Sequence, residues 1–220
     1  MNTTDFLTIA SSIVPDRPAI IFEGKTFSFG QLNERSNRLA HALTKLGIKK
    51  GDIVAILQVN CNQYLEAYYA VAKLGAIFAP LNFRAKAEEL TYMLNNCEAR
   101  ILFVGERYLE MVQGMRPNLP KVEHYVSIDK KVDGMLYYED LLTKASADDV
   151  FTEIDDNDIA MLMYTAGTTG RPKGVPLTHN SFVTYMLSNV TPVDPEIEET
   201  NLLTVPLYHV AGAQAVLAAT

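Results

Sequence analysis

The sequence has few cysteines, no long apolar run and no excess of basic residues. Its two cysteines, Cys61 and Cys97, form no Cys-x-x-Cys pair and lie near no pair of histidines. This arrangement excludes a disulfide framework and a zinc site of standard spacing. Unpaired cysteine is typical of a reducing compartment and is usually buried, so we predict two reduced thiols, in core or half-buried positions, in a cytoplasmic protein.

No segment approaches the ~18 apolar residues that a membrane-spanning helix needs, so we expect no membrane span. The first residues, Met-Asn-Thr-Thr-Asp-Phe, lack the basic and then apolar stretches of a secretion signal. A net charge of −7 argues against a nucleic-acid partner, which would require a basic face. A local anion site remains compatible with that charge, because Arg171 and Lys173 lie close together.

The composition is that of a folded protein, with 48% hydrophobic and 20% charged residues. From residue 51 onward, near-continuous apolar runs alternate with stretches of helical period. Runs of this kind predict βαβ units and a parallel sheet that helices cover on both faces. The predicted strands are 53–57, 76–79, 101–104 and 125–128, and the predicted helices are 63–74, 86–96 and 108–115.

Local signals define elements on both sides of this region. Residues 19–27 read as a short hairpin, and Ser28 with Gln31 forms a capping box that begins a helix ending at Gly47. Residues 144–157 are acidic and predict a solvated connector. The sheet is expected to continue at 159–164 and to resume at 175. A helix over about 180–189, capped by Thr178 or Asn180, and a helical stretch over 213–219 follow.

The most informative segment is 163–174, Met-Tyr-Thr-Ala-Gly-Thr-Thr-Gly-Arg-Pro-Lys-Gly, which we call the glycine-rich loop. Its glycines let backbone amides turn toward an anion, its threonines add hydroxyl donors, and its cations add charge, which together suit a polyphosphate. Pro172 stands where a Walker A loop needs glycine, and no Gly-x-Gly is present. The loop therefore belongs to neither of those two nucleotide-binding patterns.

Residues 164–174 closely resemble the phosphate-binding signature of the adenylate-forming superfamily, which contains acyl- and aryl-CoA ligases. Three further segments resemble motifs of that family in the same order: 27–32, Phe-Ser-Phe-Gly-Gln-Leu; 73–82, Lys-Leu-Gly-Ala-Ile-Phe-Ala-Pro-Leu-Asn; and 206–212, Pro-Leu-Tyr-His-Val-Ala-Gly. The resemblance runs from about residue 10 to the last residue. It implies an α/β fold, with the layered parallel βαβ sheets of the family's large N-terminal domain.

The resemblance also implies a reaction. A carboxylic acid would attack the α-phosphate of ATP with Mg²⁺, giving an acyl adenylate and pyrophosphate, and coenzyme A would then take the acyl group. His209 matches a residue that lines the acyl pocket, although a hydrogen-bonded histidine at a strand end is the structural alternative. Thr165 matches a position that can contact Mg²⁺. Lys173 and Thr165 are expected to have catalytic roles, and Ala166 stands in place of the family's usual serine. The expected phosphate-binding residues are Thr165, Ala166, Gly167, Thr168, Thr169, Gly170, Arg171, Pro172 and Lys173.

Later motifs of the family have no counterpart here. These are the Tyr-Gly-x-Thr-Glu segment that holds adenine, the ribose-binding aspartate, the hinge and the adenylating lysine. The sequence therefore predicts a partial N-terminal domain that is inactive alone, with a first subdomain over 1–150 and the start of a second region over 151–220. The sequence does not decide whether the protein forms a homodimer.

Two other interpretations remain. A peptide-synthetase adenylation domain would place an aspartate near 206–212 for the α-amine of its substrate, but the one aspartate after the loop is Asp194. The second interpretation is a non-catalytic relative that keeps the fold and binds nucleotide weakly. Two smaller expectations follow from residue chemistry: His179 is a loop or helix-cap histidine, and Tyr68 and Tyr69 serve packing.

Overall fold

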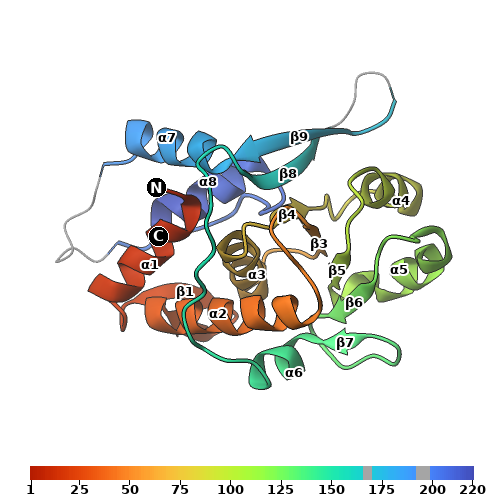
Figure 1. The fold of residues 1–220 in the computed structure, drawn as a ribbon, viewed down its shortest axis with the longest axis horizontal. Helices are drawn as coiled ribbons and strands as arrows, with labels where there is room; N and C mark the ends of the chain where they lie inside the picture. Colours follow the sequence, from red (N-terminus) through yellow and green to blue (C-terminus); the bar gives the residue numbers. More distant parts are fainter. Residues whose placement is uncertain (166–169, 192–198) are drawn as a thin grey trace.

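The computed structural model describes residues 1–165, 170–191 and 199–220 (Figure 1). Its centre is a seven-stranded sheet with the order β7-β6-β5-β3-β4-β8-β9. All neighbouring pairs are parallel except β8 and β9. The strands are β3 (Ile53–Leu57), β4 (Ile77–Pro80), β5 (Ile101–Val104), β6 (His124–Ser127), β7 (Leu136–Tyr137), β8 (Ile159–Thr165) and β9 (Lys173–Thr178).

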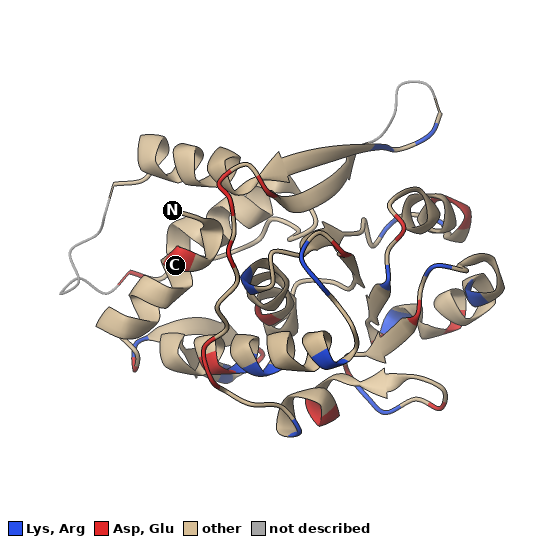
Figure 2. Ribbon diagram, viewed as in Figure 1, with Lys and Arg blue, Asp and Glu red and all other residues tan. Residues whose placement is uncertain are grey.

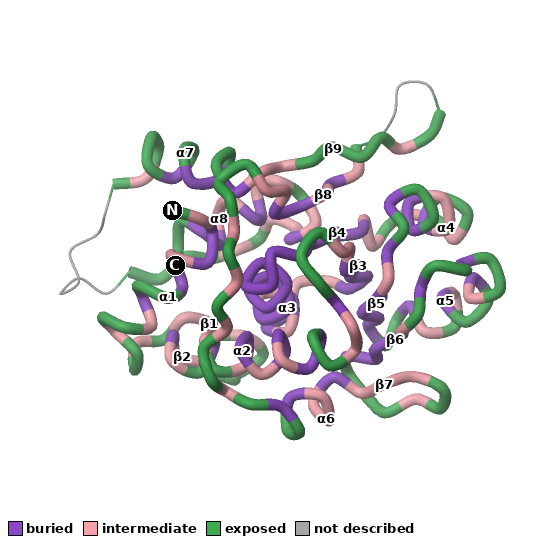
Figure 3. Tube along the Cα trace, in the orientation of Figure 1, coloured by how far each residue is buried: buried purple, intermediate pink, exposed green. Residues whose placement is uncertain are grey.

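Helices cover both faces of this sheet, as the apolar runs predict. Successive residues of a strand point to opposite faces, so Val54 and Ile56 join one hydrophobic core while Ala55 and Leu57 join the other. The first core contains α2 (Phe29–Lys45) and α3 (Asn62–Lys73), and the second contains α4 (Ala87–Asn96) and α5 (Leu109–Met115). Helix α3 is buried along most of its length (Figure 3), and Tyr68 and Tyr69 pack inside the core as expected.

The pair β8 and β9 is antiparallel, whereas the other neighbouring strands of this sheet are parallel as expected. The two strands pair from Ile159 with Thr178 to Thr165 with Lys173, which makes them one hairpin that carries the glycine-rich loop. The short loop allows only this direction, because a parallel partner would need a crossover of a dozen or more residues. Residues 151–220 thus begin in the same sheet as 51–137, and the subdomain boundary near residue 150 stays a prediction.

The N-terminal elements pack outside the main sheet. The predicted hairpin forms a separate two-stranded sheet from β1 (Pro18–Phe22) and β2 (Lys25–Ser28). The predicted capping box begins α2, because the Gln31 amide donates to Ser28 Oγ and the Ser28 amide donates to Gln31 Oε1. A helix that we did not predict, α1 (Thr3–Ile13), precedes them and has its own capping box from Asn2 and Asp5.

The remaining elements are short or lie near the C-terminal end. They are η1 (Glu106–Tyr108), η2 (Arg116–Asn118), α6 (Tyr138–Thr143), α7 (His179–Asn189) and α8 (Val210–Ala219). Thr178 caps α7, one of the two predicted caps, since its hydroxyl accepts from the Ser181 amide at 3.2 Å. Helices α1, α7 and α8 gather at one end of the molecule (Figure 1). Within the described ranges, no helix has both the length and the apolar character for crossing a bilayer.

Candidate functional site

The candidate residues follow the carboxyl ends of three adjacent parallel strands. β3 ends before Asn60, β4 ends before Phe83, and β8 ends at Thr165, within the glycine-rich loop. The carboxyl ends of parallel strands meet at one edge of a sheet, where ligands of open α/β folds commonly bind. This topology explains how segments far apart in sequence can contribute to one site.

The two ends of the glycine-rich loop are held in register by the hairpin. Thr165 pairs with Lys173 across the two strands, and both side chains are exposed. The Thr165 hydroxyl lies 3.5 Å from the Lys173 carbonyl oxygen, a contact at the long limit for a hydrogen bond, which leaves the hydroxyl available to another partner. Gly170 has a φ of 99°, a conformation that disfavours side chains. Ala166, Gly167, Thr168 and Thr169 lie outside the described residues.

The hairpin is cationic at the end that carries the loop. Arg171 and Lys173 are the two charged residues of 164–178, and no carboxylate occurs in that range. Their basic segments lie at the outer end of the hairpin in Figure 2, away from the acidic connector that crosses the other end. A segment with two cations, a hydroxyl and no acid is suited to an anion.

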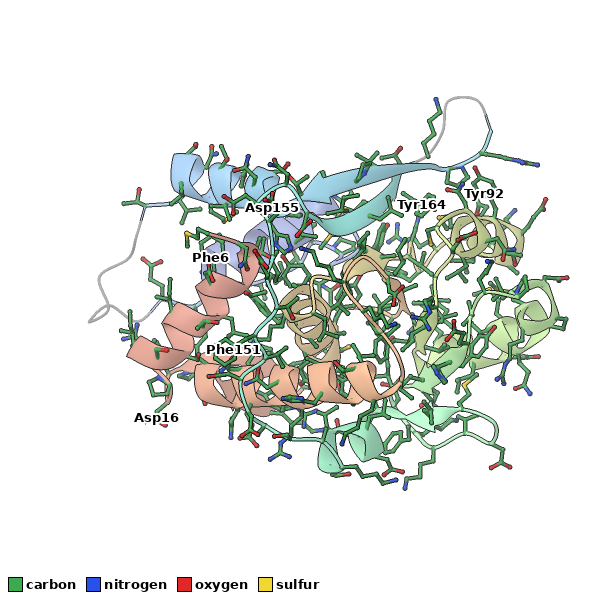
Figure 4. The ribbon with its side chains drawn as sticks, in the orientation of Figure 1. Phe6, Asp16, Tyr92, Phe151, Asp155 and Tyr164 are labelled. Carbon is green, nitrogen blue, oxygen red and sulfur yellow. The ribbon has the colours of Figure 1, made fainter. Side chains whose placement is uncertain are left out.

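Tyr164 and Tyr92 join this hairpin to α4 (Figure 4). The Tyr164 hydroxyl donates toward the Met93 carbonyl oxygen at 3.0 Å and Asn96 Oδ1 at 2.9 Å. Burial raises the pKa of Tyr164, so the phenol stays protonated and able to donate. The Arg171 guanidinium stacks over the Tyr92 ring at 5.3 Å from its centroid, which holds one of the two cations beside α4.

An open cleft of about 1060 Å³ separates the glycine-rich loop from α4 and α5. Gly170, Arg171 and Pro172 form its loop side. Its opposite walls carry both signs of charge, from Arg107 and from the carboxylates of α4 and α5. The predicted residue Pro172 thus lies on this cleft wall, beside Arg171.

His209 caps a helix rather than ending a strand, which corrects the structural alternative considered from sequence. It is the N-cap of α8, and its Nδ1 accepts from the Ala211 amide at 3.4 Å. The side chain is exposed. The backbone of 206–212 is tightly turned, because the His209 amide donates to the Pro206 carbonyl oxygen at 3.0 Å.

Two residues that we did not predict fasten this turn to the sheet. Asn60 uses both ends of its amide: Nδ2 donates to the Val205 carbonyl oxygen at 3.0 Å, and Oδ1 accepts from the Leu207 amide at 2.9 Å. Phe83 meets the Tyr208 ring edge-on at 5.1 Å between centroids. These contacts bring 206–212 to the same sheet edge as the glycine-rich loop. Only the position of Asn60 and Phe83 just after predicted strands could have indicated them.

The crevice between β3 and β5, where the strand order reverses, is filled by protein. Gln58 Nε2 donates to Asp129 Oδ2 at 3.1 Å, and Asp129 also accepts from the Glu106 amide at 2.6 Å. A Cβ on Gly105 would lie 2.3 Å from Gln58 Oε1, so the side chain is packed directly against that backbone. The candidate site is therefore the edge formed by β3, β4 and β8.

A metal site made by the protein alone is not found among residues 1–165, 170–191 and 199–220. No group of three or more histidine, cysteine, aspartate or glutamate residues there could hold an ion. Thr165 contributes a neutral hydroxyl, whereas Mg²⁺ is usually bound by one or two carboxylates together with substrate phosphates. Both cysteines are unpaired and buried as predicted, and burial raises the pKa of Cys61 to about 12.

Comparisons with known proteins bear on the family and the fold of the chain. The sequence model of the family described as AMP-binding enzyme matches residues 10–220. The 3-oxocholest-4-en-26-oate–CoA ligase of Rhodococcus rhodochrous is 36% identical, over 81% of this chain and 33% of its own length. The medium-chain-fatty-acid–CoA ligase of Ectopseudomonas oleovorans is 31% identical, over 80% of this chain and 34% of its own length.

A solved structure shares the fold over nearly all of the chain. The inhibitor-bound N-terminal domain of FACL13 from Mycobacterium tuberculosis matches with a TM-score of 0.88 and 29% identity, covering 99% of this chain and 54% of that domain. The chain spans about a third of the length of the curated relatives it matches.

Proposed function

Because the chain belongs to the AMP-binding enzyme family, we propose that it carries the phosphate-binding part of an AMP-forming carboxylate–CoA ligase. The observation that supports this most directly is the cationic glycine-rich hairpin at the carboxyl edge of the parallel sheet. The substrates would be ATP, a small carboxylic acid and coenzyme A. The acid itself stays open between acyl and aryl types.

The glycine-rich loop would hold the β- and γ-phosphates of ATP. Lys173 supplies a compact positive charge and Thr165 a hydroxyl on the facing strand, and both are exposed where an anion could reach them. Arg171 and the amides of the loop, including those of 166–170, would add donors. Their contribution is electrostatic: they position the pyrophosphate that leaves and stabilise its charge, without forming a covalent bond. Mg²⁺ would bind mainly to the phosphate oxygens, with Thr165 as its ligand from this chain.

The 206–212 segment would form one wall of the acyl site. Asn60 and Phe83 hold Leu207 and Tyr208 against the sheet edge, so His209 begins α8 beside the ends of β3 and β4. The segment contains no aspartate for binding an amino group, and Asp194 lies outside the described residues. This supports a carboxylic acid without an α-amine as the substrate, and hence a CoA ligase over a peptide-synthetase domain.

The 220 residues by themselves are expected to bind phosphate without forming acyl adenylate. The residues proposed to bind phosphate are present in the sequence, whereas the sequence contains no Tyr-Gly-x-Thr-Glu segment to hold adenine. Pyrophosphate release from ATP that depends on added octanoate or benzoate, catalysed by the purified chain, would disprove this expectation.

The test of the phosphate site is calorimetry on the purified chain with pyrophosphate, ATP and AMP at low salt. We expect pyrophosphate and ATP to bind and AMP to bind at least tenfold more weakly, because AMP lacks the two phosphates in question. Lys173→Ala should weaken pyrophosphate binding by about tenfold, as expected for loss of one charge-assisted contact. Lys121→Ala is the matched control, since Lys121 is also exposed and pairs with Glu98 at 3.8 Å. Equal effects of the two substitutions would contradict the proposal.

A further inference from the structure

The ring of His179 joins the N-terminal helix to the base of the hairpin that carries the glycine-rich loop. His179 is the first residue of α7 and directly follows β9, and its side chain is fully buried. Its Nδ1 lies 3.3 Å from the backbone nitrogen of Thr3 and 3.0 Å from Thr3 Oγ1. Thr3 is the first residue of α1 and is also fully buried. The contact therefore links residues that are 176 positions apart in the sequence.

This geometry fixes the protonation state of the ring. A backbone N–H can only donate, so Nδ1 must accept and must carry no proton. The neutral ring then has its proton on Nε2, an atom that is buried and has no hydrogen-bond partner among the residues described. A proton added to Nδ1 would point at the Thr3 N–H and leave that donor buried without an acceptor, which costs roughly 1–3 kcal/mol in proteins.

The charged groups around the ring do not change the conclusion that Nδ1 carries no proton. Asp5 on α1, Asp156 and Asp158 before β8, and Lys50 before β3 face His179, and the Tyr68 phenol of α3 lies beside Thr3. The carboxylates already have partners: Asp158 pairs with Lys50 at 2.7 Å and Asp156 with the Met1 ammonium at 3.3 Å. Asp5 caps α1 by accepting from the Asn2 amide. Burial consequently dominates over the three acids and holds the pKa of His179 below its ordinary value of 6.5.

The same residues fix the base of the hairpin. The His179 amide donates to the Asp158 carbonyl oxygen at 3.1 Å, and the Asn180 amide donates to the Asp156 carbonyl oxygen at 2.8 Å. These bonds close β8 and β9 at the end opposite the glycine-rich loop. Figure 4 places Phe6 on α1 and Asp155 in the connector at this end of the molecule. A change at the His179 ring would thus reach both α1 and the hairpin base.

We propose that His179 and Thr3 form a pH-sensitive latch: the neutral ring holds α1 against α7 and the hairpin base, and protonation at Nδ1 releases α1. The released ring takes up a proton near its ordinary pKa, whereas the docked ring resists it. The free energy of docking is therefore fully present above pH 6.5 and declines as the pH falls from 6.5 toward the lowered pKa.

The first test uses a fluorescent reporter on α1. The chain contains no tryptophan, so Phe6→Trp introduces a single tryptophan at a half-buried position of α1, and tryptophan is excited at wavelengths that the eleven tyrosines do not absorb. Between pH 8 and pH 5 we expect its emission to shift to longer wavelength, with a midpoint below pH 6.5. Far-ultraviolet circular dichroism is followed in parallel, and loss of helix throughout the chain at the same midpoint would count against a local release.

Two histidine variants in the reporter chain isolate the cause. His179→Asn places an amide oxygen near the position of Nδ1 and cannot be protonated, so the emission shift should disappear. His41→Asn is the matched control, because the half-buried His41 hydrogen-bonds through Nε2 to the Asp148 carbonyl oxygen and not to α1, and the shift should remain. A shift that persists in His179→Asn, or that is absent from the reporter chain itself, overturns the latch.

A second measurement needs no substitution at His179. Nitrogen-15 chemical shifts of the histidine rings in the unmodified chain report the tautomer directly. At pH 8 the latch requires His179 to carry its proton on Nε2 with a bare Nδ1, and the Thr3 amide signal should move as the ring titrates. A proton on Nδ1 at pH 8, or titration of His179 without a change at Thr3, overturns the proposal even if His179→Asn fails to fold.

Discussion

The Tyr164 hydroxyl lies 3.0 Å from the Met93 carbonyl oxygen, which ties the strand that enters the glycine-rich loop to the last turns of α4. Tyr164 immediately precedes Thr165, so this contact fixes the point where β8 ends. The second acceptor, Asn96 Oδ1, belongs to the same helix. Hydrogen bonds to α4 therefore hold this backbone in place in addition to its pairing with β9.

We expect Tyr164→Phe to lower the free energy of unfolding by about 1 kcal/mol, because it removes this hydrogen bonding and leaves the Met93 carbonyl oxygen with one partner fewer. Urea unfolding measures the change as a lower midpoint at an unchanged slope. Tyr185→Phe is the control, since Tyr185 is 39% exposed on α7. If both variants unfold at the midpoint of the parent chain, the Tyr164 contact does not stabilise the entry to the loop.

The 206–212 turn should loosen more when both hydrogen bonds of the Asn60 amide are removed than when only one is removed. Asn60→Ala loses the bonds to Val205 and Leu207, whereas Asn60→Asp keeps the acceptor for the Leu207 amide and loses the donor to Val205. Hydrogen exchange at the Leu207 amide should therefore accelerate about tenfold or more in Asn60→Ala and less in Asn60→Asp. Asn95→Ala removes a comparable donor from an exposed contact with Asn118 and should leave that amide unchanged.

Glu66 is the buried member of an ion pair and should tolerate substitution poorly. Its carboxylate is 1% exposed and accepts from Arg35 Nε at 2.9 Å, Asn62 Nδ2 at 2.7 Å and the Tyr138 hydroxyl at 2.8 Å. Arg35 keeps its pair with Glu139, but Glu66→Gln puts a buried NH2 group where a carboxylate oxygen accepted a hydrogen bond, so the substitution should cost about 1–3 kcal/mol.

The matched substitution for Glu66 is Glu139→Gln, because Glu139 pairs with the same Arg35 but is 36% exposed. Solvent screens that outer pair, and the expected cost is at most about 1 kcal/mol. Chemical unfolding of both variants gives the comparison, and equal losses would show that burial does not distinguish the two carboxylates.

Elements with local signals could be predicted from the sequence, and long-range relations could not. The Ser28 capping box, the Thr178 cap and the strands of the parallel sheet depend on neighbouring residues, and each is present. Helix α1 also carried a local signal, since Asn2 and Asp5 have capping-box spacing, but its apolar pattern is short and we did not predict it.

The misjudged residues are those whose partners lie far away in the sequence. His179 was expected as a loop or helix-cap residue, and it does begin a helix, yet its ring is buried against Thr3. Asn60 reaches Val205 across 145 positions, and only the fold brings the two together. The direction of β9, by contrast, could have been inferred from the sequence, because the connection from β8 is too short for a parallel crossover.

Gly212 is the glycine of the 206–212 segment, and it should not accept a side chain. A Cβ there would lie 2.4 Å from the Pro206 carbonyl oxygen and 2.9 Å from Leu207 Cα, both backbone atoms that cannot rotate away. Gly212→Ala should therefore lower the free energy of unfolding by about 1–3 kcal/mol, as overpacking does in other proteins.

Gly114→Ala provides the opposite case, because Gly114 lies in α5 with nothing within 4 Å of its added Cβ. Alanine is favoured over glycine inside a helix, so that variant should gain about 0.5–1 kcal/mol. Urea midpoints that move in opposite directions would support the close approach of α8 to Pro206, and a neutral Gly212→Ala would contradict it.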